Sequence, residues 1–454
     1  DVGVDEGFTV DMGAGTDTIT FSGGARDFSA QTVSMAGVEA ITNAANVTLT
    51  AAAFVTDNIF SKAGAGTLIV TGTANSDNVD ASNVVVTAGG ITINGGASAD
   101  TLTGAATATA INGGDGNDTI TGGAGADTID GGNGNDTIST GAGGGAVGGG
   151  AGNDTITGGA GADVITGGAG ADTMTGGAAG DTYVVNTGEV VAGESIVEAA
   201  TATGTDTVRI DTTTDLTAMT AASFDNIEAI TFNGDFSATA SSAQLTGETL
   251  VVNGDGAGNA DVLTINVGIG ETGVFTGLTT ATAGSIVISG ATGAETITAS
   301  AAGGSITAGF GLDTITAGAG TDLIVLNYTL DSTVDFDTIA SFTSATDKLQ
   351  LSAADIDGKV TGTPLGTLIT GNVDTVAGTE LGTNAAASVL IAANAAALTG
   401  GSIALSTDTQ TVIYLTDVAE VYINDDGATA GGLTKIADLG SAVTLVELDF
   451  QFIA

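Results

Sequence analysis

Cysteine, histidine and tryptophan are absent from this chain of 454 residues, and Pro364 is its only proline. Without cysteine no disulfide can form, and without cysteine or histidine no thiolate or imidazole metal site is possible. The lack of histidine also excludes an H-E-x-x-H zinc site and a Ser-His-Asp triad, and no pair of carboxylates stands out as a glycosidase site. We therefore expect a protein that is not an enzyme.

Basic residues are scarce, with 6 Lys and Arg against 52 Asp and Glu, which gives a formal net charge of −46. Such a chain repels nucleic acid and anionic membranes and needs cations to be compact. We therefore expect no nucleic-acid partner. No apolar run is long enough for a membrane span, so we also expect no membrane insertion. The Ala-rich stretch 386–398 is too short to span a membrane and predicts a buried helix.

Glycine is abundant, with 74 residues, and much of it lies in a nine-residue repeat. Ten nonapeptides follow one another in a single phase from Gly95 to Val184. One frame position carries an apolar residue in every unit: Leu102, Ile111, Ile120, Ile129, Ile138, Val147, Ile156, Ile165, Met174 and Tyr183. Two positions earlier stand Asp100, Thr109, Asp118, Asp127, Asp136, Gly145, Asp154, Asp163, Asp172 and Asp181. Eight of these ten are Asp, which chance does not produce.

Each unit predicts a Gly-rich turn followed by a short strand whose Ile points inward. Glycine allows positive φ, so that backbone carbonyls converge in the turn, and Asp adds a carboxylate oxygen. A negatively charged cage made only of oxygen suits Ca²⁺, a hard cation of flexible coordination. The sequence therefore predicts several calcium ions bound in these turns.

Weaker copies of the repeat lie elsewhere. The tract 290–325 places Glu295, Gly304, Asp313 and Asp322 at the Asp position, and "MGAGTDTIT" at 12–20 is an isolated unit. The candidate calcium ligands are Asp17, Asp100, Gly114, Gly116, Asp118, Gly123, Gly125, Asp127, Gly132, Gly134, Asp136, Gly150, Gly152, Asp154, Gly159, Gly161, Asp163, Gly168, Gly170, Asp172, Asp181, Asp313 and Asp322.

β-Branched residues, turn residues and the near absence of helical periods predict an all-β chain. A larger motif occurs twice, because "DTIT" at Asp17 and "DTVR" at Asp206 are each followed, 21 residues later, by "VEAIT" or "IEAIT". We expect five parts: a β module over 1–94, a repeat roll over 95–184, a second β module over 185–289, a shorter roll with its closing segment over 290–351, and a β-rich C-terminal domain over 352–454. Their tandem order predicts an elongated, solenoid-like architecture.

The nonapeptides of 95–184 closely resemble the RTX (repeats in toxin) family, as do "GDTYVVNTGEVVAGESIVEAATATGTDTVRI" from Gly180 and "DFDTIASFTSATDKLQLS" from Asp335. The resemblance implies a parallel β-roll with two nonapeptides per turn, and calcium shared between stacked loops. It also implies type I secretion, for which the tail of the chain resembles a C-terminal signal.

In a roll of two units per turn, alternate Asp positions stack on the same edge. One edge then carries an unbroken Asp column, whereas Thr109 and Gly145 interrupt the other. We expect a continuous calcium ladder on the first edge and an interrupted one on the second. Tyr183 is expected to close the core. Glu194 and Glu198 are expected to be solvated, with the capping of the last calcium as the alternative.

Three functions fit these features. We favour a secreted structural protein at the cell surface, a subunit of an S-layer or similar lattice or filament that forms homo-oligomers. A calcium-stiffened adhesin that binds a bacterial surface or its polysaccharide is the nearer alternative. An ice-binding protein is the third, because the outward positions give Thr pairs at Thr119/Thr121, Thr155/Thr157 and Thr173/Thr175, although Asp130, Ala146 and Val164 break the pattern on the other face.

Overall fold

The computed structural model describes residues 46–51, 61–198, 203–256, 261–281, 284–326, 337–343 and 346–352, with shorter segments inside 8–43 and 373–453. The chain forms two compact units, Asp1–Asn233 and Gly234–Ala454. Strands dominate both, and the described helices are single turns, η2 (Ala221–Phe224) and α1 (Ser242–Leu245). The all-β prediction is confirmed.

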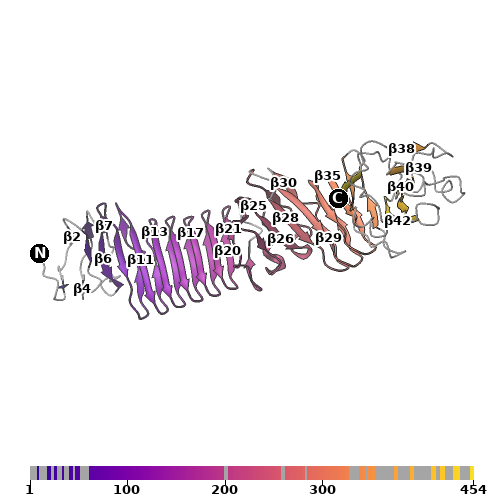
Figure 1. Ribbon diagram of the computed structural model, residues 1–454. Helices are drawn as coiled ribbons and strands as arrows, with labels where there is room; N and C mark the ends of the chain where they lie inside the picture. The colour runs from indigo at the N-terminus through magenta and orange to yellow at the C-terminus, as the bar shows by residue number, and fades with distance from the viewer. Residues whose placement is uncertain are drawn as a thin grey trace. The chain divides into compact units, whose positions relative to one another are not determined.

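Unit 1 is a parallel β-solenoid built on two sheets, whose strands lie side by side like rungs in Figure 1. The strands of the longer sheet in this unit are β3 (Arg26–Asp27), β6 (Val47–Thr50), β8 (Leu68–Thr71), β11 (Ile91–Ala97), β13 (Thr109–Asp115), β15 (Thr128–Asn133), β17 (Ala146–Ala151), β19 (Val164–Ala169), β21 (Thr182–Val185), β23 (Thr207–Ile210) and β25 (Ala229–Phe232). The seven-stranded sheet contains β9 (Asn78–Asp80), β12 (Thr101–Thr103), β14 (Thr119–Gly123), β16 (Thr137–Gly141), β18 (Thr155–Gly159), β20 (Thr173–Gly177) and β22 (Ser195–Ile196).

The chain alternates between the two sheets, so that each nonapeptide supplies one strand and two make one coil. Ile120 on β14 pairs with Ile138 on β16, which pairs with Ile156 on β18, a step of 18 residues each time. The longer sheet keeps the same step between Ile129 and Val147. The expected parallel β-roll with two units per turn is confirmed.

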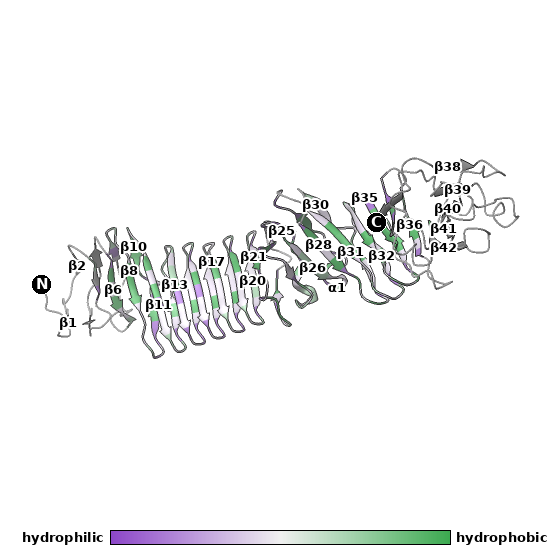
Figure 2. Cartoon of the chain, in the orientation of Figure 1, coloured by the Kyte–Doolittle hydropathy of each residue, from purple (hydrophilic) through white to green (hydrophobic). Residues whose placement is uncertain are grey.

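The core of the roll is one column of side chains per sheet. All ten predicted inward residues are buried, and Tyr183 at the end is 0% exposed, as expected. Their neighbours along each strand are mostly outward Thr or small residues, because side chains alternate between the faces of a strand. In Figure 2 the strands of the roll are accordingly pale, with short green segments.

The strands that flank the nonapeptides continue the same sheets. β8 pairs with β11 before the repeat tract, and β21 pairs with β23 after it, both parallel. Unit 1 also contains a four-stranded sheet and a two-stranded sheet. Their strands are β2 (Thr18–Phe21), β5 (Ala40–Asn43), β7 (Ser61–Ala63) and β10 (Val85–Val86) in the first, and β1 (Phe8–Thr9) and β4 (Val33–Ser34) in the second. The short β24 (Thr214–Asp215) completes the unit.

Unit 2 repeats the parallel arrangement, with an exception at one strand. One sheet holds β26 (Ser237–Ser241), β28 (Val262–Asn266), β31 (Ser285–Ser289), β33 (Gly303–Thr307), β35 (Thr321–Leu326), β37 (Lys348–Ser352) and β43 (Phe450–Ile453). The facing sheet holds β29 (Thr272–Val274), β32 (Thr296–Thr298), β34 (Thr314–Thr316), β36 (Asp337–Ala340), β42 (Leu433–Asp438), β41 (Glu420–Asn424), β40 (Thr411–Leu415), β39 (Val389–Ala392) and β38 (Val373–Val376). Within this facing sheet, β41 pairs antiparallel with β40 and with β42. β27 (Val251–Asn253) pairs with β30 (Thr279–Ala281).

The helix expected within 386–398 is wrong. Residues Val389–Ala392 form β39, which pairs in parallel with β38 and with β40. The local sequence "VLIA" carries the β-branched residues Val389 and Ile391, a residue type that favours strands. Sheet pairing therefore outweighs the helix propensity of the surrounding alanines.

Candidate metal centre

The loops along one edge of the roll hold an unbroken column of buried aspartates. Its members are Asp100, Asp118, Asp136, Asp154 and Asp172, each at most 2% exposed. Oδ1 of each later member accepts a hydrogen bond from the backbone amide of the Asp one coil earlier, as at Asp136 N to Asp154 Oδ1, 2.8 Å. One oxygen of every carboxylate is thus hydrogen-bonded to a backbone amide of the neighbouring coil.

The second oxygen, Oδ2, has no hydrogen-bond partner among the described residues at any of these five aspartates. It points at the start of its own loop. A Cβ atom placed on Gly149 would lie 2.4 Å from Asp154 Oδ2 and 2.5 Å from the Gly167 carbonyl oxygen of the next coil. Carboxylate and carbonyl oxygens therefore line one small space, and a buried carboxylate oxygen is costly without a partner. This donor set fits Ca²⁺ shared between stacked loops.

The opposite edge carries carboxylates at only three of its five positions. Asp127, Asp163 and Asp181 are buried, and their Oδ2 atoms likewise lack a hydrogen-bond partner among the described residues. Thr109 and Gly145 fill the remaining places and donate only their backbone amides to the next Asp. The expected contrast between one continuous and one interrupted carboxylate column is confirmed, while the spacing of the ions remains a prediction.

At Gly145, where the second column lacks a carboxylate, a threonine hydroxyl group binds the carbonyl oxygen of the next coil. The first residue of that loop is Thr140 in place of the usual glycine, and its Oγ1 donates to the carbonyl oxygen of Gly158. This carbonyl corresponds to the one that Gly167 presents on the first edge. Thr140 therefore satisfies the oxygen that calcium would otherwise bind.

The glycines of the two edges serve different purposes. On the first edge both turn glycines of each loop adopt positive φ, among them Gly150 (110°) and Gly152 (135°); the others are Gly114, Gly116, Gly132, Gly134, Gly168 and Gly170. On the second edge only the first of the two positions does so, at Gly123, Gly141, Gly159 and Gly177. Gly125 and Gly161 are not at positive φ, which corrects the expectation for them. They are needed for close approach, since a Cβ on Gly161 would lie 2.0 Å from the backbone nitrogen of Gly144.

Burial raises the carboxyl pKa values throughout both columns. Desolvation is the largest cause, and it brings the pKa of Asp127, Asp154 and Asp181 to about 6. The backbone hydrogen bond to Oδ1 opposes this rise. Ionised carboxylates at neutral pH are therefore costly unless a cation binds them.

The family model of the RTX calcium-binding nonapeptide repeat matches residues 92–107, 112–145, 148–183 and 289–324. The chain therefore carries RTX calcium-binding nonapeptide repeats over these four segments. No curated protein and no solved structure matches it significantly. RTX nonapeptide repeats bind Ca²⁺, and the stacked, buried Asp loops fit several calcium sites. RTX repeats are typical of extracellular proteins that leave the cell by type I secretion. Among the described residues, no helix has the length and apolar character that crossing a bilayer requires.

The second RTX tract continues into carboxylates that the sequence pattern did not single out. Glu295 N donates to Asp313 Oδ1 at 2.7 Å, and Asp313 N donates to Asp337 Oδ1 at 3.2 Å. On the other edge, Asp322 N donates to Asp347 Oδ1 at 3.1 Å. Asp337 and Asp347 lie 24 and 25 residues after their partners, so a search at a step of 18 misses them. Of the remaining predicted ligands, Asp17 lies outside the described residues.

Two glutamates at the end of the first RTX roll are buried, which makes the expectation that they are solvated wrong. Glu194 is 5% exposed and Glu198 is 8% exposed, because β22 pairs with β20 and places the next coil on the last nonapeptides. Glu194 accepts a hydrogen bond from Asp172 N at 3.2 Å and so continues the first column.

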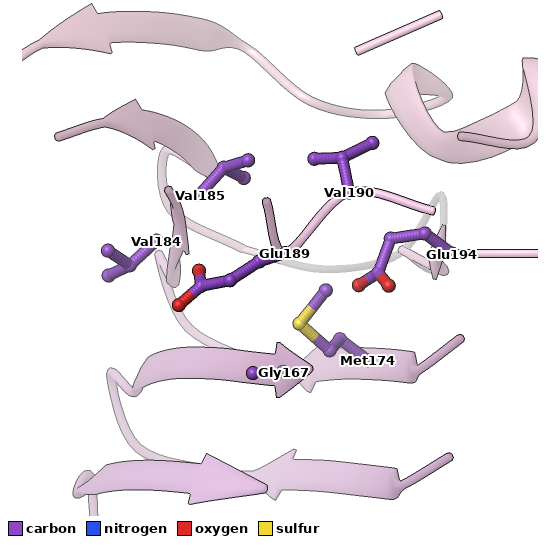
Figure 3. Close-up of a pocket in the computed structure, with 8 residues that line it drawn as sticks. Gly167, Met174, Val184, Val185, Glu189, Val190 and Glu194 are labelled. Atoms are coloured by element: carbon purple, nitrogen blue, oxygen red, sulfur yellow. The ribbon is translucent and has the colours of Figure 1, made fainter. Parts of the chain in front are cut away.

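A small pocket lies at this end of the first edge, and Figure 3 shows the side chains of Glu189, Glu194 and Met174 around it. Desolvation, together with the negative charges of Asp172, Glu189 and Asp154, raises the pKa of Glu194 to about 8. Without a cation, Glu194 is therefore largely protonated at neutral pH.

Proposed function

We propose that the protein is a secreted structural protein, a subunit of an S-layer or a similar extracellular lattice or filament, which folds and assembles on binding Ca²⁺. The observation that carries this proposal is the unbroken parallel register of coils in unit 1, with carboxylates turned into the bends on both edges. Such a stack is stiffened by ions placed between its coils, which suits a load-bearing building block. The proposed role is not enzymatic.

Calcium has a large part in folding under this proposal. Each coil of the roll buries only one large apolar side chain per sheet, so the hydrophobic contribution per residue is small. The binding free energy of metal ions then becomes folding free energy, as in other metal-dependent domains. A chain of this kind stays unfolded where calcium is scarce and folds once it is outside, which suits type I secretion.

The negative charge of the chain also makes assembly dependent on calcium. A net charge of −46 keeps copies of the chain apart. Divalent ions bound between surface carboxylates lower that repulsion and bridge neighbouring subunits. We therefore propose a homo-oligomer, and a bacterial cell surface or its polysaccharide as the site to which the lattice attaches.

One observation favours ice binding as a second candidate. The outward face of the seven-stranded sheet carries Thr in register on consecutive strands, with Thr119 beside Thr137 and Thr137 beside Thr155. The second row runs through Thr121, Ser139 and Thr157. A regular array of hydroxyl and methyl groups orders water, but Thr is also a favoured strand residue.

Electron microscopy of the purified chain tests the structural proposal. In millimolar calcium we expect ordered sheets or filaments, and with a chelator we expect them to disperse. Particles that remain monomeric in calcium would contradict the proposal. A glycan and whole-cell binding screen and a thermal hysteresis measurement on the same sample then distinguish an adhesin from an ice-binding protein.

A further inference from the structure

The second edge ends at the nonapeptide that contains Asp181. Every earlier loop on this edge has the loop of another nonapeptide beside it in the next coil, but this last loop does not. Asp181 is the aspartate of this unit, and the next carboxylate of its column, Asp206, comes 25 residues later. The RTX family model stops at residue 183, so nothing in the repeat pattern supplies the oxygen atoms that would complete a site here.

A glutamate oxygen occupies the place of the missing carbonyl. One coil earlier, a Cβ on Gly158 would lie 2.6 Å from Asp163 Oδ2 and 2.2 Å from the Gly176 carbonyl oxygen. At Gly176 the same construction gives 2.3 Å to Asp181 Oδ2 and 2.5 Å to Glu198 Oε1. The Glu198 carboxylate thus stands where the next nonapeptide would have placed a glycine carbonyl.

The surrounding groups hold Glu198 in this position. Gly176 N donates to Glu198 Oε1 at 2.8 Å, and the hydroxyl group of Tyr183 donates to the same oxygen. Asp206 completes the cluster, with its Oδ1 accepting from Asp181 N at 2.8 Å. Carboxylate oxygens of Asp181, Glu198 and Asp206 lie within 4.8 Å of one another, and all three residues are buried.

Two of these acidic groups, Asp181 and Asp206, have no basic side chain paired to them in the described part of the chain. The only ion pair among the described residues joins Arg209 to Asp211. Asp181 is 0% exposed, and its Oδ2 points into the cluster with no hydrogen-bond partner from any described residue. A buried carboxylate oxygen in this state indicates a bound cation, because the alternative is a large desolvation cost.

We propose that Asp181, Glu198 and Asp206 form a separate Ca²⁺ site that closes the second edge of the roll. It differs from the nonapeptide sites in composition, because a third carboxylate replaces a glycine carbonyl. Higher ligand charge raises calcium affinity, so this site fills at lower calcium than the nonapeptide sites. The inference rests on the geometry of this coil and is independent of the lattice proposal.

Terbium luminescence on the full chain tests the site, because Tb³⁺ occupies calcium sites and is sensitised by a nearby tyrosine. Tyr183 contacts Glu198, and tryptophan is absent from the chain. We expect sensitised emission at low Tb³⁺ that calcium competes away, and its loss in Tyr183→Phe. Emission unchanged in Tyr183→Phe would overturn the site.

Glu198→Gln keeps the shape of the side chain and removes its charge, and Asp206→Asn does the same for the third ligand. We expect at least about tenfold weaker Tb³⁺ and Ca²⁺ binding at this site, and one fewer tightly bound ion in a calorimetric titration. Asp130→Asn, on an exposed carboxylate of the roll, is the matched control and leaves both unchanged.

Wild-type binding in both acidic variants would overturn the proposal. Should the variants fail to fold, anomalous diffraction from wild-type crystals grown with Tb³⁺ decides the matter. A peak between the three carboxylates supports the site. Density for ions in the nonapeptide loops alone overturns it.

Discussion

At the scale of single residues, each aspartate of the columns combines two tasks. Oδ1 joins one coil to the next through a backbone amide, and Oδ2 faces the space lined by carbonyl oxygens. Asparagine retains an oxygen for the first task but brings no charge to the second. The two tasks are therefore separable by a conservative substitution.

We expect Asp154→Asn to remove calcium binding at the centre of the first column while the coils remain stacked. Loss of one charged ligand lowers the affinity at least about tenfold, which corresponds to about 1.4 kcal/mol of calcium-linked stability. The thermal midpoint in excess calcium measures it, with Asp130→Asn as the control for charge alone. Equal midpoints for Asp154→Asn and the control would exclude Asp154 as a ligand.

Lys62 is a second residue whose role the repeats do not reveal. It is fully buried on β7, and its Nζ donates to the carbonyl oxygens of Gly64 (2.9 Å), Gly66 and Ala88 (2.7 Å). An ammonium group here lies in a bend lined by carbonyls, much as a calcium ion does in the nonapeptide loops. Burial lowers its pKa, but three acceptors favour the charged form.

We expect Lys62→Met to lower the free energy of unfolding by about 3 kcal/mol, because carbonyl oxygens are left buried without donors. Denaturant unfolding in saturating calcium measures this loss. A loss below about 1 kcal/mol would show that the three hydrogen bonds contribute little.

At the scale of strands and loops, the sequence predicts the regular coils and misses the irregular ones. A fixed step of nine is enough to place Ile120, Ile138 and Ile156 in register, because two short strands and two tight turns leave no room for other lengths. Between Asp181 and Asp206 the step becomes 25, and from Asp206 to Glu228 it becomes 22. Loops of variable length remove the nine-residue period from the sequence, although the parallel pairing of the strands continues.

A local signal for the irregular coils does exist. Asp206 and Asp337 are followed, two residues later, by the buried Val208 and Ile339, as in the nonapeptides. An acidic residue two positions before a buried apolar residue thus marks a coil even when the spacing changes. Glu198 itself has no such mark, because it follows the buried Ile196 of β22 instead of preceding a buried strand residue.

The loop at residues 140–145 on the second edge, where the Thr140 hydroxyl binds the Gly158 carbonyl, offers a way to add a calcium site. Thr140→Gly combined with Gly145→Asp restores the pattern of the intact loops, since Gly141 and Gly143 are already present. A Cβ at Gly145 would lie 2.6 Å from the carbonyl oxygen of Asp127, so the backbone must shift slightly. We expect one additional bound calcium ion and a higher thermal midpoint in calcium.

Calorimetric titration counts the ions in this double variant and in the two single variants. Gly145→Asp alone should gain no ion, because the Thr140 hydroxyl still binds the Gly158 carbonyl. An ion count equal to that of the wild type in the double variant would show that the loop cannot be restored by these two positions.

At the scale of the whole molecule, a thin core is combined with a charge of −46. Removal of calcium leaves both the buried carboxylate oxygens and the overall repulsion uncompensated. We expect circular dichroism to lose its β signal in a chelator and to regain it with calcium. Magnesium should not replace calcium, because it demands a more rigid geometry. A β spectrum that survives chelation would contradict calcium-linked folding.

The stability of the metal-free chain should depend on pH in the opposite direction to that of the calcium form. Desolvation raises the pKa of Asp154, Asp181 and Asp322 to about 6, and that of Glu194 to about 8, above their ordinary values near 4. Without metal, the folded state then binds more protons than the unfolded state between these limits. Its stability is full below the ordinary pKa values and is lost as the pH rises through 6 toward 8.

With calcium the sign reverses, because protons compete for the same oxygens and weaken binding as the pH falls below about 6. The folded fraction seen by circular dichroism from about pH 8 down to about pH 5, with chelator and with calcium, follows both curves. We expect them to converge toward the acid end, where protons begin to neutralise the columns as calcium does at neutral pH. A metal-free chain that gains stability as the pH rises would mean that its buried carboxylates are solvated in the absence of calcium, and that the bends open when the ions leave.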